Sequence, residues 1–261
     1  VTPSPMPQSV LHRQGTPIRK FIRKGPEKNM PYYYGFDMTY VVFVLPALIF
    51  TLIAQGMVQS TFRKYARVPS DRGMTGADAA RLVLEQNGVT GVRIASTSGS
   101  LTDHYDPRDN TIYLSQTVFD VQSAAAVGVA AHEAGHAVQH AVGYFPIRIR
   151  SAIIPITNIG SSLAVPLVIA GLIFSYYPLA YLGVICFGAC VVFQLVTLPV
   201  EFNASRRALQ TLRSSGMVSE SGLSAAGHVL RAAAMTYVAA LAVALGNLLR
   251  LISLANRSKR D

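Results

Sequence analysis

Charged residues and cysteines are scarce in this chain of 261 residues. Asp, Glu, Lys and Arg together make up only 14% of it, tryptophan is absent, and hydrophobic residues make up 51%. A soluble globular domain carries about 25% charged residues, so this composition favours a membrane protein. The two cysteines, Cys186 and Cys190, lie four residues apart in an apolar run. They provide neither a disulfide framework nor an all-cysteine zinc site, and we expect both thiols to be buried.

Acidic residues are especially few, 13 against 23 Lys and Arg, which gives a formal net charge of +10. Residues 1–29 hold six Lys and Arg and one Glu, or +5 of this charge, in a Pro-rich basic tail that we expect to be disordered. The change of composition at Met30 suggests that translation starts at that residue and that residues 1–29 are not part of the protein. The alternative is that these residues form a basic arm that contacts anionic lipid headgroups. Without the tail the charge falls to +5, so we expect no nucleic-acid partner.

Four apolar segments are each close to the ~20 residues that cross a bilayer. They cover residues 38–58, 152–174, 179–200 and 232–252. Only SYYP at residues 175–178 separates the second from the third, which predicts a hairpin of two membrane helices. Small residues would let these two helices approach closely, namely Gly160, Ala164, Gly183 and Gly188. The alternative, buried core helices of a soluble protein, is less expected for four such segments in so short a chain.

The region between the first two apolar segments, about residues 60–145, is polar and mixed in pattern. Thr75 and Asp78 resemble the N-cap and the first-turn carboxylate of a helix that ends at Gly88. Alternating apolar residues then predict two short strands, around 92–94 and 112–114, joined through SLTDHYDPRDN. A long helix rich in Ala and Gly should follow from about residue 120 to 142 and pack closely on at least one face.

The long predicted helix contains the motif H-E-x-x-H, formed by His132, Glu133 and His136. Residues four apart lie one helical turn above each other, so the two imidazoles can hold one zinc ion. Glu133 lies beside them and can take a proton from a zinc-bound water, whose pKa zinc lowers towards ~7. The alternative is a chance match, in which the histidines form local bonds within a packed helix.

A catalytic zinc needs a third protein ligand and an open fourth position. The chain has Gln139 and Val142 where the extended metzincin pattern requires Gly and His. No acidic residue occurs between Glu133 and Glu201, and Glu201 lies at the end of the third apolar segment, where an unused acid is costly. We therefore expect Glu201 to be the third ligand. The alternatives for this carboxylate are a salt bridge with Arg206 and a position at a helix N-terminus.

Two other groups of ionisable residues remain open in role. His140 lies one turn beyond the motif and competes for the ligand role, although a contact with a ligating histidine is the more common use of such a residue. Asp103, His104 and Asp106 in LTDHYDP either support the zinc histidines or contact the substrate backbone, or they form a turn.

Over residues 30–254 the chain resembles the YugP-like family of membrane zinc metallopeptidases. The resemblance is carried by YGFDMTY, VQSTFRKYARV, MTGADAARLVLEQNGV, LTDHYDP, AAHEAGHAVQH, PVEFNASRRAL and AAAMTYVAA, in this order. It implies a zinc-dependent, multi-pass membrane peptidase, with its chemistry at His132, Glu133 and His136.

The broader HtpX-like membrane peptidases are similar in another way, because H-E-x-x-H, a membrane hairpin and a glutamate occur there in the same order. This likeness also implies Glu201 as a ligand. A Glu-x-x-x-Asp pattern is usual in that group, whereas Ser205 stands at the Asp position here. The group that orients the zinc histidines is therefore open, and Asn203 and Asp103 are candidates.

Basic clusters predict the side of the membrane on which the chemistry takes place. Three clusters flank the expected catalytic region, namely Arg63, Lys64 and Arg67, then Arg148 and Arg150, then Arg206 and Arg207. By the positive-inside bias this region faces the cytoplasm. The C-terminal cluster of Arg257, Lys259 and Arg260 disagrees if the fourth segment spans fully. Either that helix lies partly in the interface, or the rule is violated once.

We therefore expect a mainly α protein of the cell membrane, with multi-pass helices and a small α+β zincin-like catalytic region. Its expected parts are a basic tail (1–29), a first transmembrane helix (30–59), a soluble catalytic region with the zinc-binding helix (60–150), a transmembrane hairpin (151–200), a helical region with the third ligand (201–231) and a fourth apolar helix with a basic C-terminus (232–261). The expected function is hydrolysis of a peptide or protein substrate, either soluble or membrane-associated. The alternative is a non-catalytic membrane scaffold, whose structural zinc a fourth ligand such as His140 or Asp103 would close.

Overall fold

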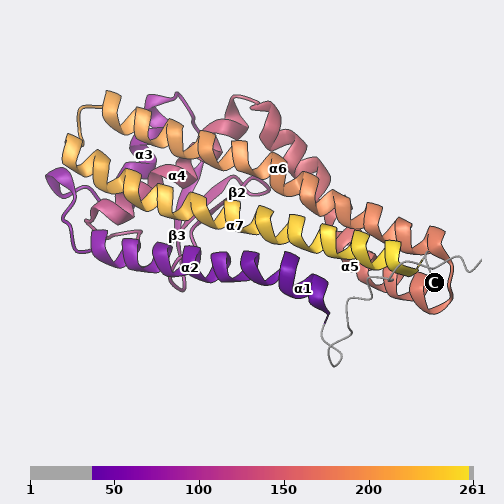
Figure 1. Cartoon of the computed structure of the whole chain (residues 1–261). Coiled ribbons are helices and arrows are strands. Elements are labelled where there is room, and N and C mark those ends of the chain that lie inside the picture. Colours follow the sequence, from indigo (N-terminus) through magenta and orange to yellow (C-terminus); the bar gives the residue numbers. More distant parts are fainter. Residues whose placement is uncertain (1–36, 259–261) are drawn as a thin grey trace, which may run out of the picture. The chain divides into compact units, whose positions relative to one another are not determined.

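The computed structural model describes residues 37–258 as a set of long helices with one small sheet (Figure 1). The predicted basic tail and most of the C-terminal basic cluster lie outside this part. In chain order the elements are α1 (Met38–Phe43), α2 (Leu45–Tyr65), a 3-10 turn (Asp71–Gly73), α3 (Gly76–Gln86), β1 (Arg93–Thr97), β2 (His104–Asp106), β3 (Thr111–Ser115), α4 (Ala124–Ala141), α5 (Phe145–Ile173), α6 (Tyr177–Ser214) and α7 (Glu220–Ser258).

Four helices, α2, α5, α6 and α7, are long and apolar enough to cross a membrane. The third and fourth predicted segments lie within α6 and α7, and all but the last residue of the second lies within α5. The first predicted segment, residues 38–58, is divided between α1 and α2, with a break at Val44. The helices α6 and α7 have 38 and 39 residues, or about 57–59 Å at 1.5 Å per residue. That is nearly twice the ~30 Å of a hydrocarbon core, so each helix has length for a span and for an extension beyond it.

The helices α5 and α6 form the predicted hairpin and pack closely along it (Figure 1). A Cβ atom on Gly160 would lie 2.8 Å from the carbonyl oxygen of Cys186, and one on Gly183 would lie 2.5 Å from that of Ala164. Side chains larger than hydrogen would force the two helices apart at these points. Gly188 was wrongly placed in this interface, because no atom lies within 4 Å of the position that its Cβ would take.

The sheet has the strand order β1-β3-β2, with β3 in the middle and largely buried. Strand β1 pairs with β3 in parallel, with Ile94 opposite Ile112, and β2 pairs with β3 in the antiparallel sense, with Tyr105 opposite Ile112. The sequence predicted β1 and β3 but assigned the residues of β2 to a connecting loop. A strand of three residues is too short to show an alternating pattern.

The helix α3 begins at the predicted cap. Thr75 Oγ1 accepts a hydrogen bond from the Asp78 N–H at 3.1 Å, and the Asp78 carboxylate accepts one from the Thr75 N–H at 3.1 Å. This reciprocal pair satisfies two of the helix's free N–H groups. Apolar side chains of α3, α4, β3 and the adjoining ends of α6 and α7 then form one buried core, which includes Val83, Leu114 and Leu212.

The helix α4 begins four residues later than expected, because Ser123 caps it through a 3.2 Å bond from the Ala126 N–H. Its small residues allow close packing, as predicted. A Cβ on Gly135 would lie 2.7 Å from the carbonyl oxygen of Ala204 in α6. On the side that faces α7, a Cβ on Gly128 would lie 3.2 Å from Ala226, which is also a close contact. Two long apolar helices therefore hold α4 in place.

Candidate metal centre and active site

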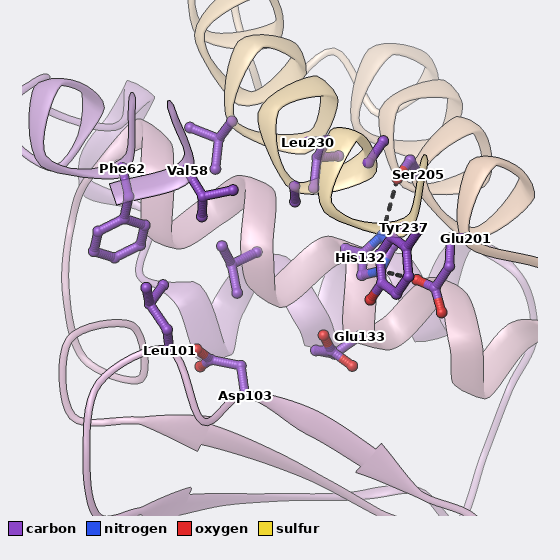
Figure 2. Close-up of a pocket in the computed structure, with 14 residues that line it drawn as sticks. Val58, Phe62, Leu101, Asp103, His132, Glu133, Glu201, Ser205, Leu230 and Tyr237 are labelled. Atoms are coloured by element: carbon purple, nitrogen blue, oxygen red, sulfur yellow. Dashed lines mark hydrogen bonds and ion pairs between the residues drawn. The ribbon is translucent and has the colours of Figure 1, made fainter. Parts of the chain in front are cut away.

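The structure brings His132 and His136 of α4 together with Glu201 of α6 (Figure 2 shows His132 and Glu201). The Nε2 atoms of the two histidines lie 3.2 and 3.4 Å from the same carboxylate oxygen, Oε2 of Glu201. The three ligand atoms all lie within 4.8 Å of one another, and the Glu201 side chain is almost completely buried. Residues 69 positions apart in the sequence thus form one cluster.

These separations fit the donor set of a tetrahedral zinc ion. With bonds of about 2.0–2.1 Å, two ligand atoms of such an ion are about 3.3–3.4 Å apart, which agrees with the two N···O distances observed here. Among residues 37–258, no fourth His, Cys, Asp or Glu belongs to the cluster. The three side chains could therefore hold a metal ion and leave one position open.

Hydrogen bonds to the other ring nitrogens orient both histidines. His132 Nδ1 lies 3.0 Å from Ser205 Oγ, so the serine that replaces the aspartate of the broader group itself contacts this ring. His136 Nδ1 lies 3.0 Å from Gln139 Oε1. Neither Asn203 nor Asp103 contacts a motif histidine directly, although both were candidates for this role.

The bonds of Gln139 fix the tautomer of His136. The amide nitrogen of this completely buried side chain donates to Val200 O at 2.8 Å and to Asn203 Oδ1 at 3.0 Å. Its Oε1 atom must therefore accept, and His136 Nδ1 must carry the proton. The lone pair of His136 Nε2 is then free to face Glu201, as a metal ligand requires. Asn203 also accepts from Arg207 Nε at 2.8 Å, which holds the amide in this orientation.

Glu201 lies in the interior of α6, and its basic partner comes from α5. Arg150 NH1 lies 3.1 Å from Glu201 Oε1. Both alternative interpretations of Glu201 are therefore wrong, since α6 continues unbroken from Tyr177 and Arg206 is not the partner. A buried carboxylate needs a compensating charge. Arg150 supplies it on one oxygen and leaves the other oxygen to the histidines.

Glu133 is held in place by β2, the strand that the sequence did not predict. Its Oε2 accepts a hydrogen bond from the Tyr105 backbone N–H at 3.1 Å. Burial raises the pKa of Glu133 to about 7, and the charges of Glu201 and Asp103 act in the same direction. A nearby divalent cation would lower this pKa again, because it favours the charged carboxylate.

These groups line a cavity of about 140 Å³ between α2, α4, α6 and α7 (Figure 2). Its polar lining consists of Asp103, His132, Glu133, Glu201, Ser205 and Tyr237. Its apolar lining consists of Val58, Phe62, Leu101, Val129, Val229, Leu230, Ala233 and Ala234. The sequence reasoning missed Tyr237, whose ring lies beside His132 and Glu201 in Figure 2. The available signal was a single tyrosine among small apolar residues in AAAMTYVAA.

The remaining candidates lie outside the cluster. Asp103 reaches the cavity, but its carboxylate accepts from Ser115 N–H at 2.7 Å and lies 3.1 Å from Ser115 Oγ. His104 is exposed, and Asp106 forms an ion pair with the neighbouring Arg108. The ring of His140 packs against Tyr105. Neither Asp103 nor His140 therefore joins the three ligands, as the alternative of a closed structural zinc site would require.

Known proteins resemble this chain over most of its length. A family described as "Putative neutral zinc metallopeptidase" matches residues 40–256. The "Putative membrane protease YugP" of Bacillus subtilis (strain 168) is 42% identical over 215 residues, which cover 82% of this chain and 96% of that protein. No solved structure matches the chain.

Proposed function

Because this chain belongs to the neutral zinc metallopeptidase family, we propose that it is a membrane-spanning zinc endopeptidase. The convergence of His132, His136 and Glu201 on one point, beside Glu133 and in a cavity, carries this proposal. These three residues would hold the zinc ion, and the open fourth position would take water. Zinc in this place supplies a water of lowered pKa and polarises the carbonyl group of the substrate.

The residues of the chain move the proton and stabilise charge. Glu133 would take a proton from the attacking water and pass it to the leaving amine, which is general acid–base work for a carboxylate beside the proposed metal site. The Tyr105 N–H occupies Glu133 Oε2 and so leaves Oε1 to face the cavity. Tyr237 lines the same cavity beside Glu201, where its hydroxyl could donate a hydrogen bond to the developing oxyanion of the cleaved peptide.

The four long helices provide the membrane spans of the proposed enzyme. Their ends at residues 65, 145, 214 and 220 lie on the same side as the sheet, whereas residue 37, the α5–α6 turn and the end of α7 lie at the other end (Figure 1). The basic clusters near the catalytic region support a cytoplasmic location for that side, by the positive-inside bias. Arg150 is left out of this comparison of basic residues, because its charge is paired with that of Glu201.

Labelling tests the proposed orientation. In a Cys186→Ala, Cys190→Ala background, Ser100→Cys places one thiol on an exposed loop beside the sheet. A membrane-impermeant maleimide should label it in inverted vesicles and not in intact cells. Labelling in intact cells alone would reverse the proposed orientation without affecting the proposed chemistry.

The substitution Glu133→Gln tests the chemistry. The amide keeps the shape of the side chain but cannot take a proton, so hydrolysis should fall about 10²–10⁴-fold while zinc binding persists. His132→Ala is the matched control, because it should lose zinc and hydrolysis together. Equal hydrolysis of a peptide by the Glu133→Gln protein and the original would reject the role of Glu133.

A further inference from the structure

The cavity continues beyond the candidate metal ligands into an apolar pocket. Going back along α7 from Tyr237, its wall is formed by Ala233 and Leu230, and across the cavity lie Val58 and Phe62 of α2 (Figure 2). The whole cavity, including the part beside the candidate metal ligands, measures about 140 Å³, and an apolar cavity of about 150 Å³ is large enough to take a benzene molecule. The cavity therefore has room for about one side chain the size of Phe or Leu, which its apolar part would receive.

We infer that the substrate is a membrane-anchored polypeptide, cut close to the membrane surface and next to a large apolar side chain that fills this pocket. This inference rests on the proposed function and specifies its substrate. Two independent observations support it, namely the apolar lining of the pocket and the position of the cluster along the long helices.

The depth of the cluster can be measured along two helices that pass it. On α6, Glu201 lies five residues before Arg206, or about 8 Å along the axis. On α7, Tyr237 lies six residues after Arg231, or about 9 Å. Both arginines lie on the side of the sheet. On both helices the reacting groups therefore lie on the membrane side of the arginine that is nearest to the apolar segment.

The uncharged length of α7 locates the apolar slab. Arg231 and Arg250 enclose 18 uncharged residues, and the two arginines are about 28 Å apart along the helix. This length matches the ~30 Å hydrocarbon core of a bilayer. Tyr237 then lies within the first 10 Å of the slab. The catalytic groups therefore lie just inside the boundary of the slab, close to where a membrane helix of a substrate leaves the hydrocarbon core.

Two exposed apolar side chains lie near the cluster, one at its depth and one closer to the side of the sheet. Phe202, next to Glu201, is 47% exposed, and Phe145, five residues before Arg150 at the start of α5, is 70% exposed. Such side chains are unfavourable in water but suit the headgroup boundary of a membrane. A peptide that diffuses freely in water must enter this layer, whereas an anchored one is already in it.

The pocket is tested with soluble peptides and the zinc-loaded full chain. Two fluorogenic peptides differ only at the residue beside the cleaved bond, which is Phe in one and Asp in the other. We expect kcat/KM to be about 100-fold higher for Phe, because an apolar pocket rejects a charge. Ala233→Leu fills the pocket and should reduce this ratio at least tenfold, whereas Ala240→Leu, which is outside the lining, should preserve it.

A second variant tests the same pocket in case the Ala233→Leu protein does not fold. Val58→Ala enlarges the pocket from α2 and should shift the preference from Phe towards a larger naphthylalanine. If neither peptide is cleaved, the proposed function fails. If both peptides are cleaved at equal rates, the peptidase stands and the pocket inference is overturned.

The depth is tested with two anchored substrates in proteoliposomes. Each carries the same Phe-containing segment, placed four residues from a membrane helix in one and behind a 20-residue helical spacer in the other. The spacer lifts the segment about 30 Å from the surface while both remain anchored. We expect the near segment to be cut at least ten times faster, and equal rates would overturn the inference.

Spin labels measure the same depth without any cleavage. In the cysteine-free background, a label at Phe202 should be accessible to oxygen and protected from a water-soluble nickel chelate. Arg213 provides the aqueous reference position, and Ile185, which is 71% exposed in the apolar first half of α6, provides the lipid-facing one. A Phe202 label with the accessibility of the Arg213 label would place the cluster in water and refute the inference.

Discussion

The contact between α4 and α6 at Gly135 should control metal affinity, and Gly135→Ala perturbs it with one methyl group. This glycine lies between the two motif histidines and faces the backbone of Ala204. Its added Cβ would lie 2.7 Å from the Ala204 carbonyl oxygen, where ordinary contact begins at 3.4 Å. The two helices must therefore separate by about 0.7 Å at this point, or α4 must rotate by a similar amount.

That displacement acts directly on the ligand set, because α4 carries His132 and His136 while α6 carries Glu201. Metal–ligand distances hold within about ±0.2 Å, so 0.7 Å is several times the tolerance. We expect zinc affinity to fall about 10–100-fold, or 1.4–2.8 kcal/mol. The free energy of unfolding should fall by about 0–2 kcal/mol, because overpacking costs about 1–3 kcal/mol and the helix propensity of Ala returns about 1 kcal/mol.

The matched control is Gly188→Ala, since this position in α6 has no atom within 4 Å of an added Cβ. It gains the same helix propensity without a clash, so its zinc affinity should equal that of the original protein. Competition with a chromophoric chelator measures the affinity, and thermal unfolding with and without zinc measures the stability. A Gly135→Ala protein that binds zinc as tightly as the control would refute the proposed link between helix spacing and the metal site.

Three further substitutions examine the groups around the ligands. Gln139→Leu should lower zinc affinity about 10–100-fold in the chelator titration, because His136 loses the acceptor that fixes its tautomer. Arg150→Met should free the second oxygen of Glu201 to bind the metal, so that the visible absorption of a cobalt-loaded protein weakens towards that of five-coordinate cobalt, and Arg150→Lys should largely restore it. Ser205→Asp should raise zinc affinity through a stronger bond to the His132 ring while lowering the melting temperature of the metal-free protein. Unchanged zinc affinity in Gln139→Leu would contradict the first argument, and an unchanged cobalt spectrum in Arg150→Met would contradict the second. For Ser205→Asp, zinc affinity and melting temperature that both rise or both fall would contradict the third.

Local rules predicted the elements whose signals lie within a few residues. The cap at Thr75 and the two motif histidines one turn apart on α4 follow from backbone hydrogen bonding and helical periodicity, and the structure has both. The fourth apolar segment, residues 232–252, lies inside α7, which begins twelve residues earlier, at Glu220. Hydropathy shows only where a helix becomes apolar. The first turns of α7 are more polar, so the hydropathy pattern does not show that the helix begins there.

Contacts between distant residues were harder to predict. The number of acidic residues was small enough to select Glu201, but nothing in the sequence predicts that Arg150 binds it or that Tyr237 faces it. Those contacts depend on the register of α5, α6 and α7, which the packing of small residues such as Gly160 and Gly135 sets. The strand β2 was missed for a similar reason, since its pairing with β3 and its bond to Glu133 are tertiary.

The charges around the cavity explain why a serine can stand where the broader group has an aspartate. Glu133, Glu201 and Asp103 bring three carboxylates to the cavity, and Arg150 offsets one of them. A divalent ion at the proposed site would offset the other two, so the loaded centre would be neutral when all three are ionised. Ser205 contacts His132 without adding charge, whereas an aspartate there would leave one negative charge unbalanced between apolar helices. The neutral hydroxyl of Ser205 therefore suits a site in which Arg150 and a divalent ion already balance the three carboxylates. An Asp at position 205 should be tolerated best when a second basic residue is introduced nearby.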